Sequence, residues 1–130
     1  MSDRVLMRSP LGRAVGLGSA KEGVQHWWVQ RLTAVALVPL MLWLVAGLVG
    51  HVGADRAAVV AWLGSPLPAI VLILTLIAGL YHMALGVQVV IEDYIHTEWV
   101  KLAAVVLDRF AALALAVAGI FAVLRIAVGG

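Results

Sequence analysis

His82 is the residue whose chemistry is hardest to explain by packing alone. It lies nine residues before Ile91, in an apolar block that runs from Leu67 to Ile91 without a charged side chain. Ionisable side chains that deep in an apolar block are costly in a membrane and tend to be functional. A neutral imidazole there needs a hydrogen-bond partner on a neighbouring helix or a metal ion, and the metal that suits it is haem iron, through axial ligation. Gly86, one helical turn further on, would let a flat macrocycle approach the backbone, although small residues also line ordinary contacts between membrane helices.

Asp93 and Tyr94 follow at the end of the same block. In a continuous helix Asp93 lies three turns beyond His82, on nearly the same face and about 16 Å along the axis. The pair is either a polar helix end with a tyrosine anchor, or one wall of a polar pocket at the bilayer edge for an amphiphilic ligand. In the second case the phenol donates a hydrogen bond to a carbonyl oxygen, and the carboxylate holds an arginine of a partner.

Arg31 stands at the threshold of another apolar block, which runs from Leu32 to Gly50. It either anchors this helix end, with its stem along the apolar surface, or supplies a counter-charge for an anionic group such as a haem propionate. His26, five residues earlier, is the one side chain nearby that could assist it.

The other ionisable residues of the apolar part point less clearly to chemistry. His51 and His96 lie at helix ends and show no special geometry in the sequence. Asp108 and Arg109 interrupt a third apolar block near its start, and we expect them to face a protein partner, either paired with each other or separately.

Three apolar blocks must position these residues. The chain has 130 residues, of which 64% are hydrophobic and only 12% charged, whereas a soluble domain carries about twice that charged fraction. A helix needs about 20 residues to cross the hydrocarbon core. The sequence therefore predicts an all-α membrane protein, with an N-terminal cytoplasmic or interfacial segment over residues 1–31 and a three-helix anchor domain over 32–128. The spans are expected at about 32–51, 67–91 and 102–127.

Basic residues set the expected orientation. Five of the nine Lys and Arg residues lie within residues 1–31, and such flanks stay in the cytoplasm. The loop over 92–101 is then cytoplasmic as well, and the Asp55–Arg56 loop lies outside with the C-terminus. Glycines over 16–23 predict a loop before the membrane, with a short amphipathic turn over 24–30. Tryptophans flank the apolar blocks as interfacial anchors, with one exception inside the first block, Trp43; the anchors are Trp27, Trp28, Trp62 and Trp99.

Several functional classes are excluded by what the sequence lacks. It has no cysteine, which excludes thiol catalysis, disulfides, zinc–thiolate sites and iron–sulfur clusters bound by this chain. It has no glycine-rich phosphate loop and no nucleophile elbow. No basic face exists outside the N-terminal tail, so a nucleic-acid partner is not expected. The first apolar run begins too deep, and is too long, for a signal peptide. We therefore expect no catalysis by this chain alone.

Two segments resemble the small hydrophobic membrane anchor of succinate dehydrogenase (respiratory complex II). The first is Gly23–Ala34, whose end Gln-Arg-Leu-Thr-Ala differs from the Ser-containing His-Arg-x-Thr-Gly motif typical of the sister anchor, the cytochrome b subunit. The second is His82–Tyr94, because in that family a haem-ligating histidine precedes an Asp-Tyr pair at this spacing.

This resemblance implies a role within a larger complex. The expected partners are a flavoprotein with FAD, an iron–sulfur protein carrying the clusters, the cytochrome b anchor subunit and membrane lipid. Electrons from succinate would reach ubiquinone at the membrane surface, with haem b shared between the two anchors. By motif position, His82 would be an axial ligand of the haem iron, Gly86 would give the haem clearance and Arg31 would meet a propionate. Tyr94 would hydrogen-bond the quinone and Asp93 would orient the site. A bacterial inner membrane is the expected location.

Two alternatives remain open at this point. One is the anchor of a fumarate reductase that uses menaquinone. The other is a non-redox accessory membrane subunit, which would bind no haem.

Overall fold

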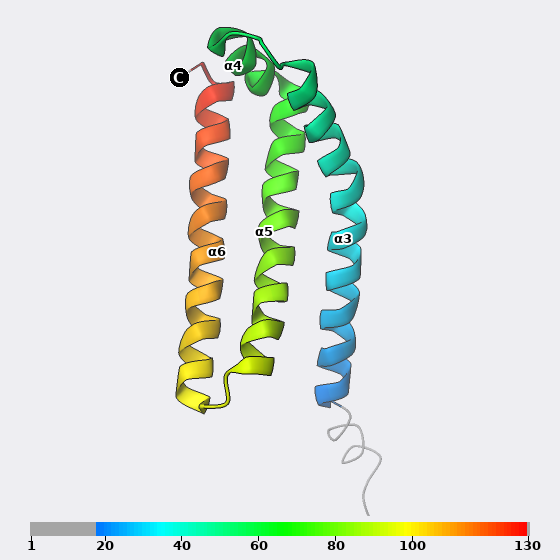
Figure 1. The fold of residues 1–130 in the computed structure, drawn as a ribbon, viewed down its shortest axis with the longest axis vertical. Coiled ribbons are helices and arrows are strands. Elements are labelled where there is room, and N and C mark those ends of the chain that lie inside the picture. The colour runs from blue at the N-terminus through cyan, green and yellow to red at the C-terminus, as the bar shows by residue number, and fades with distance from the viewer. Residues whose placement is uncertain (1–17, 130) are drawn as a thin grey trace, which may run out of the picture.

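The computed structural model describes the backbone of residues 18–129 and the side chains from Gly23 onward. Three of the basic residues on which the expected orientation depends lie outside this range: Arg4, Arg8 and Arg13. The described chain is all helical (Figure 1). Three helices are long and apolar enough to cross a membrane. The four helices in chain order are α3 (Gly18–Gly50), α4 (Arg56–Gly64), α5 (Pro66–Tyr94) and α6 (Glu98–Ala127).

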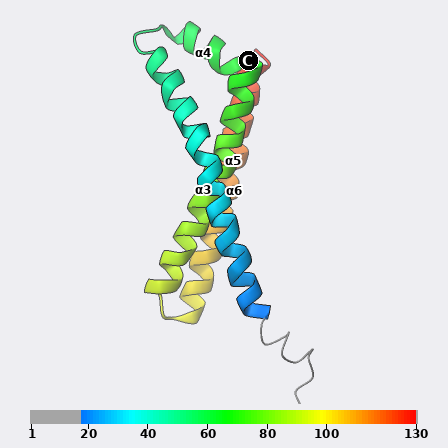
Figure 2. The same ribbon diagram turned by 90° about the vertical axis from the view of Figure 1, so that its right-hand side faces the viewer.

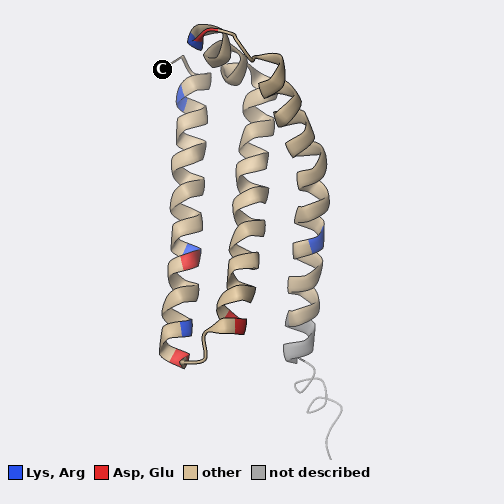
Figure 3. Ribbon diagram, viewed as in Figure 1, with Lys and Arg blue, Asp and Glu red and all other residues tan. Residues whose placement is uncertain are grey.

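Helix α5 occupies the middle of the bundle and packs against both α3 and α6, whereas the backbones of α3 and α6 do not come close to each other in the described part (Figure 1). The start of α3 and the short α5–α6 connection lie at one end, which we call the N-terminal end. Helix α4 and the last residues of α6 lie at the opposite end, the α4 end. Lys, Arg, Asp and Glu lie at the two ends and also partway along α3 and α6, nearer the N-terminal end, and the long stretch from there to the α4 end is uncharged (Figure 3).

The first long helix begins earlier than the sequence predicts. Helix α3 already starts at Gly18 and runs through Gly23, so the expected loop before the membrane is wrong over these residues. A glycine inside a helix costs only about 1 kcal/mol relative to alanine, which the favourable helical residues around it offset. Pro39 lies inside α3 without ending it, and membrane helices tolerate such a proline because neighbouring groups satisfy the freed carbonyl.

The connection between the first two long helices is itself helical. Asp55 caps α4, and its Oδ1 accepts a hydrogen bond from the Ala58 backbone N–H at 2.8 Å. Helix α5 then begins at Pro66, directly after Ser65. Proline suits a first helical turn because its missing N–H would have no partner there.

Very little of the chain is buried by the chain itself. Figure 2 shows that α3 crosses α5, so that the two helices diverge toward both ends. The buried residues line the contacts of α5 with its neighbours, and they are Pro68, Ala69, Thr75, Ala84, Leu85 and Val123. Most large apolar side chains remain exposed along all three long helices. Such exposed apolar surfaces suit lipid or further apolar helices as surroundings.

Candidate functional site

A groove opens between α3 and α5 where the two helices diverge at the N-terminal end. Its volume is about 520 Å³. His82 and Arg31, which the sequence singles out separately, both line it. The remaining lining residues are Gly23, His26, Trp27, Gln30, Ala34 and Val89.

One ring nitrogen of His82 is held by α3. Its Nδ1 lies 3.0 Å from the hydroxyl oxygen of Thr33, so the helix contact fixes the orientation of the imidazole. No hydrogen bond engages Nε2 within the described chain. The ring is therefore anchored on one side and has its other nitrogen free for a group outside this chain.

Polar atoms without partners lie beside the same groove. His26 Nε2 and Gln30 Oε1 are buried and form no hydrogen bond among the described residues. Buried polar groups in native proteins are nearly always hydrogen-bonded, so these two atoms call for partners that the described residues do not supply. The Arg31 side chain is exposed, and its guanidinium lies 5.2 Å from the centre of the Trp27 ring. A cation and unpaired polar atoms from one helix thus face a histidine from another.

Gly86 is not required by packing within this chain. A Cβ built there would lie 3.9 Å from Gln30 Nε2, an ordinary van der Waals distance. A steric reason for glycine at this position would therefore come from a group that this chain does not contain. A haem plane beside His82 is such a group, so the residues present fit a haem: a histidine nitrogen, an arginine, unpaired polar atoms and a position without a side chain.

Asp93 and Tyr94 are not part of the groove. They form the last turn of α5, where the Ile95 backbone N–H donates to Ile91 O. Both side chains are exposed, Tyr94 by 79%. Because α5 is continuous from His82 to Tyr94, the pair lies about 16 Å along the axis from His82. The structure therefore separates the two predicted sites, one in the groove and one at the helix end.

Asp108 and Arg109 do not form an ion pair with each other in the described chain. Arg109 instead donates a hydrogen bond to Gln88 Oε1 of α5, and Gln88 Nε2 donates to Glu92 Oε1 at 2.8 Å. Arg109 thus contacts α5 instead of pairing with Asp108, and the prediction that it faces a protein partner stays a prediction. Asp108 Oδ2 is buried and has no hydrogen-bond partner among the described residues, so the prediction of an outside partner for Asp108 stays open.

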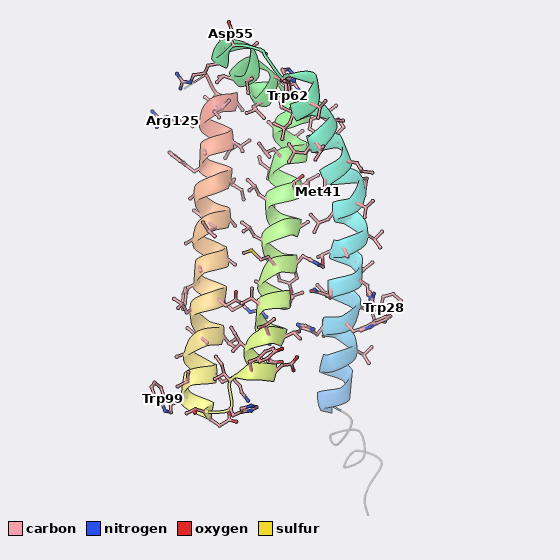
Figure 4. The ribbon with its side chains drawn as sticks, viewed as in Figure 1. Trp28, Met41, Asp55, Trp62, Trp99 and Arg125 are labelled. Atoms are coloured by element: carbon pink, nitrogen blue, oxygen red, sulfur yellow. The ribbon has the colours of Figure 1, made fainter. Side chains whose placement is uncertain are left out.

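The α4 end holds an aromatic stack that the sequence does not reveal. The Trp62 ring lies parallel to His51, with centroids 4.3 Å apart, and to Trp43, with centroids 5.8 Å apart. Trp62 therefore turns inward between α4 and α3, unlike the exposed Trp28 and Trp99 (Figure 4). The short helix α4 folds Trp62 back over α3, which gives His51 a packed environment that its place in the sequence does not predict, and the interfacial depth of Trp62 stays a prediction.

Thr33, the hydrogen-bond partner of His82, is a residue that sequence reasoning missed. It lies within the segment that carries the family resemblance, yet a threonine near a helix start is common. Its partner is 49 residues away on another helix, and only the crossing of α3 and α5 brings the two together. Gln30 and Gln88 were missed for the same reason.

Comparison with known proteins identifies the family. Residues 6–120 match the family described as succinate dehydrogenase/fumarate reductase transmembrane subunit. The succinate dehydrogenase hydrophobic membrane anchor subunit of Rickettsia bellii is 42% identical over 88 residues, which cover 68% of this chain and 70% of that protein. The subunit of the same name from Paracoccus denitrificans is 32% identical over 121 residues, 93% of each chain. The chain belongs to the family of succinate dehydrogenase hydrophobic membrane anchor subunits.

This anchor is accordingly a subunit of the succinate dehydrogenase complex and a multi-pass membrane protein. The Paracoccus denitrificans anchor aligns along nearly the whole length, so the aligned stretch spans the residues of the His82 groove and the end of α5. No solved structure matches the chain.

Proposed function

We propose that this anchor holds one side of a haem b, with His82 as one axial ligand of the iron and Arg31 facing a propionate. The observation that carries the proposal is the His82 ring in the α3–α5 groove, with Nδ1 anchored at 3.0 Å to Thr33 and with no hydrogen bond at Nε2 among the described residues. Metal-bound histidines nearly always have their second nitrogen hydrogen-bonded in this way.

The groove also suits the rest of a haem. Arg31 provides a positive charge for a carboxylate, and charge-assisted hydrogen bonds of this kind are stronger than neutral ones. His26 Nε2, buried without a partner among the described residues, is a second polar atom on the same helix. Gly86 leaves clearance beside His82. These residues would hold a haem, which when bound would supply one-electron transfer.

The second axial ligand is proposed to come from another chain. A six-coordinate b haem takes two, and His82 is the single histidine inside the span Pro66–Tyr94. The cytochrome b anchor subunit is the proposed source, packed against the exposed apolar surface of this chain. The flavoprotein with its FAD and the iron–sulfur protein complete the complex and supply electrons from succinate.

Tyr94 and Asp93 are proposed to take part in the ubiquinone site. Tyr94 is 79% exposed at the end of α5, where its hydroxyl can donate to a quinone carbonyl oxygen. Asp93 beside it can hold a cationic side chain of a partner and so orient the site. This chain binds and positions the quinone, and the chemistry of succinate oxidation belongs to the other subunits.

The setting follows from the same arrangement. We propose that the N-terminal end faces the cytoplasm of a bacterium and that the helices cross its inner membrane, as the basic N-terminal segment predicts. The named relatives are succinate dehydrogenase anchors, which favours succinate oxidation over a fumarate reductase anchor. Family membership favours a redox subunit over a non-redox accessory one. The quinone that co-purifies with the complex distinguishes a succinate dehydrogenase anchor, which uses ubiquinone, from a fumarate reductase anchor, which uses menaquinone.

The deciding experiment compares two histidines in the purified complex. His82→Ala is expected to abolish or alter the reduced-minus-oxidised haem spectrum. His51→Ala, a matched change directly after the end of α3, is expected to leave it unchanged. An unaltered spectrum in an assembled His82→Ala complex would overturn the haem assignment, and a spectrum lost equally in both variants would mean that the loss is structural.

A further inference from the structure

The hydroxyl group of Thr33 meets three polar atoms at once. It lies 2.8 Å from Val29 O, 3.0 Å from Gln30 O and 3.0 Å from His82 Nδ1. A hydroxyl has one hydrogen to donate and two lone pairs, and the two backbone carbonyls can only accept. If the hydrogen pointed at His82, the hydroxyl lone pairs would face both carbonyl oxygens at close range. The favourable arrangement gives the hydrogen to the carbonyls and leaves Thr33 Oγ1 as an acceptor toward His82.

The tautomer of His82 follows from this arrangement. Because Oγ1 accepts, Nδ1 has to carry the ring hydrogen and donate it, and Nε2 keeps the lone pair. In the opposite tautomer Nε2 carries the hydrogen and cannot bind a metal ion, since a metal ligand must be an unprotonated nitrogen. We infer that Thr33 is a positioning residue that selects the iron-binding tautomer of His82 and sets the electron density of that ligand. This inference rests on the proposed haem function.

The packing of the two helices holds this hydrogen bond in place. One turn away, a Cβ at Gly79 of α5 would lie 3.7 Å from Leu37 Cδ2 of α3, so the helices approach closely beside the Thr33–His82 pair. Both Thr33 and His82 are partly buried, which shields their hydrogen bond from water. The imidazole is therefore oriented by a rigid helix contact rather than by a mobile loop.

The expected effect on the iron has a definite sign. A hydrogen bond from Nδ1–H to an acceptor makes the imidazole more basic and donates more electron density to the metal. More electron density favours the ferric state and lowers the reduction potential. Removing the acceptor is therefore expected to raise the haem midpoint potential, and losing such a partner typically weakens metal binding about 10- to 100-fold.

The experiment uses the whole purified complex and four variants. Thr33→Val replaces the hydroxyl with a methyl group and keeps the side-chain shape. Thr33→Ala removes both the hydroxyl and the methyl group. Thr33→Ser keeps the hydroxyl. Thr75→Val is the matched control, because the Thr75 hydroxyl donates to Val71 O at 2.7 Å four residues earlier and forms no hydrogen bond to a histidine among the described residues. The readouts are the midpoint potential, the EPR g-values of the ferric haem and the haem content per complex.

We expect a higher potential and weaker haem retention in both Thr33→Val and Thr33→Ala, and wild-type values in Thr33→Ser and Thr75→Val. An unchanged potential in both oxygen-free variants would overturn the inference. So would a shift in Thr75→Val of the same size, since that would trace the effect to general loss of a helix hydroxyl. An assembled His82→Ala complex with an intact haem would instead overturn the proposed function, so the two failures are distinguishable.

Discussion

The two ends of the bundle use the same residue type, histidine, in opposite ways. At the α4 end, His51 Nδ1 donates to Gly47 O at 2.7 Å, and the Trp62 ring covers one face of the imidazole. At the N-terminal end, His82 Nδ1 is anchored at 3.0 Å to Thr33, and the ring lines an open groove. Each histidine has its Nδ1 side held, but only the groove beside His82 leaves room for a ligand.

The glycines at the two ends show the same contrast. A Cβ at Gly47 would overlap the six-membered ring of Trp62, so glycine there is required by the chain's own packing. A Cβ at Gly86 meets nothing closer than 3.9 Å. The α4 end is thus completed by its own side chains, whereas the N-terminal end has unpaired polar atoms and space that other components must fill. The surroundings of the imidazole ring in the structure therefore indicate a histidine's role better than its position within an apolar block does.

The largest effect is expected from cysteine labelling, which tests whether the two ends face opposite sides of the membrane. The chain has no native cysteine, so a single introduced cysteine reports its own position. Cysteine at the exposed Ala54, at the α4 end, is expected to react with an impermeant reagent added from outside. Cysteine at the exposed Thr97, at the other end, is expected to react only after the membrane is opened. The reverse pattern would place the His82 groove on the outer side and contradict the proposed orientation.

The next largest effect is expected from Tyr94→Phe, a substitution that distinguishes quinone reduction from haem binding. Tyr94→Phe removes only a hydroxyl and is expected to lower ubiquinone reduction on the order of 100-fold, as loss of one donor to a developing oxyanion does. The haem spectrum and succinate oxidation with a soluble dye are expected to survive, because neither needs that hydroxyl.

Tyr81→Phe is the control for the tyrosine experiment, since Tyr81 lies on the same helix more than three turns away and faces the α5–α6 side. It is expected to turn over quinone normally. Normal turnover in Tyr94→Phe as well would show that Tyr94 is only an interfacial anchor.

The smallest effect tests the glycine contrast. Gly47→Ala forces a methyl group against the Trp62 ring and is expected to cost about 1–3 kcal/mol, as overpacking usually does. A lower melting temperature of the purified complex would report it. Gly86→Ala is expected to leave the melting temperature of the haem-free complex unchanged and to reduce haem retention. Equal stability losses from both substitutions would mean that Gly86, too, is needed for packing within the chain.

Much of the fold is predictable because the bilayer imposes it. A span needs about 20 apolar residues, and three blocks meet that requirement near the observed helices α3, α5 and α6. The break at Ser65–Pro66 was predictable from the backbone limits of proline. The start of α3 was not, because glycines weaken a helix only modestly, and neither was α4, whose Asp55 cap is a short local feature.

The candidate site was predictable residue by residue but not as a geometry. His82 stood out because an ionisable group in an apolar block is rare. Its contact with Thr33 depends on how α3 crosses α5, which apolar periodicity does not determine. The pairing of Arg109 with Gln88 instead of Asp108 depends on the α5–α6 packing in the same way. Contacts between distant segments depend on how the helices pack, so they are hard to predict from a single sequence.

The central claim is that His82 Nε2 binds haem iron while Nδ1 stays on Thr33. An experimental structure of the assembled complex, determined with its haem at a resolution that places side chains, tests it most directly. We predict Nε2 of His82 coordinated to the iron, Nδ1 within hydrogen-bond distance of Thr33 Oγ1 and a propionate near Arg31. An iron whose axial ligands both come from another chain, with His82 hydrogen-bonded to a neighbouring helix instead, would contradict it.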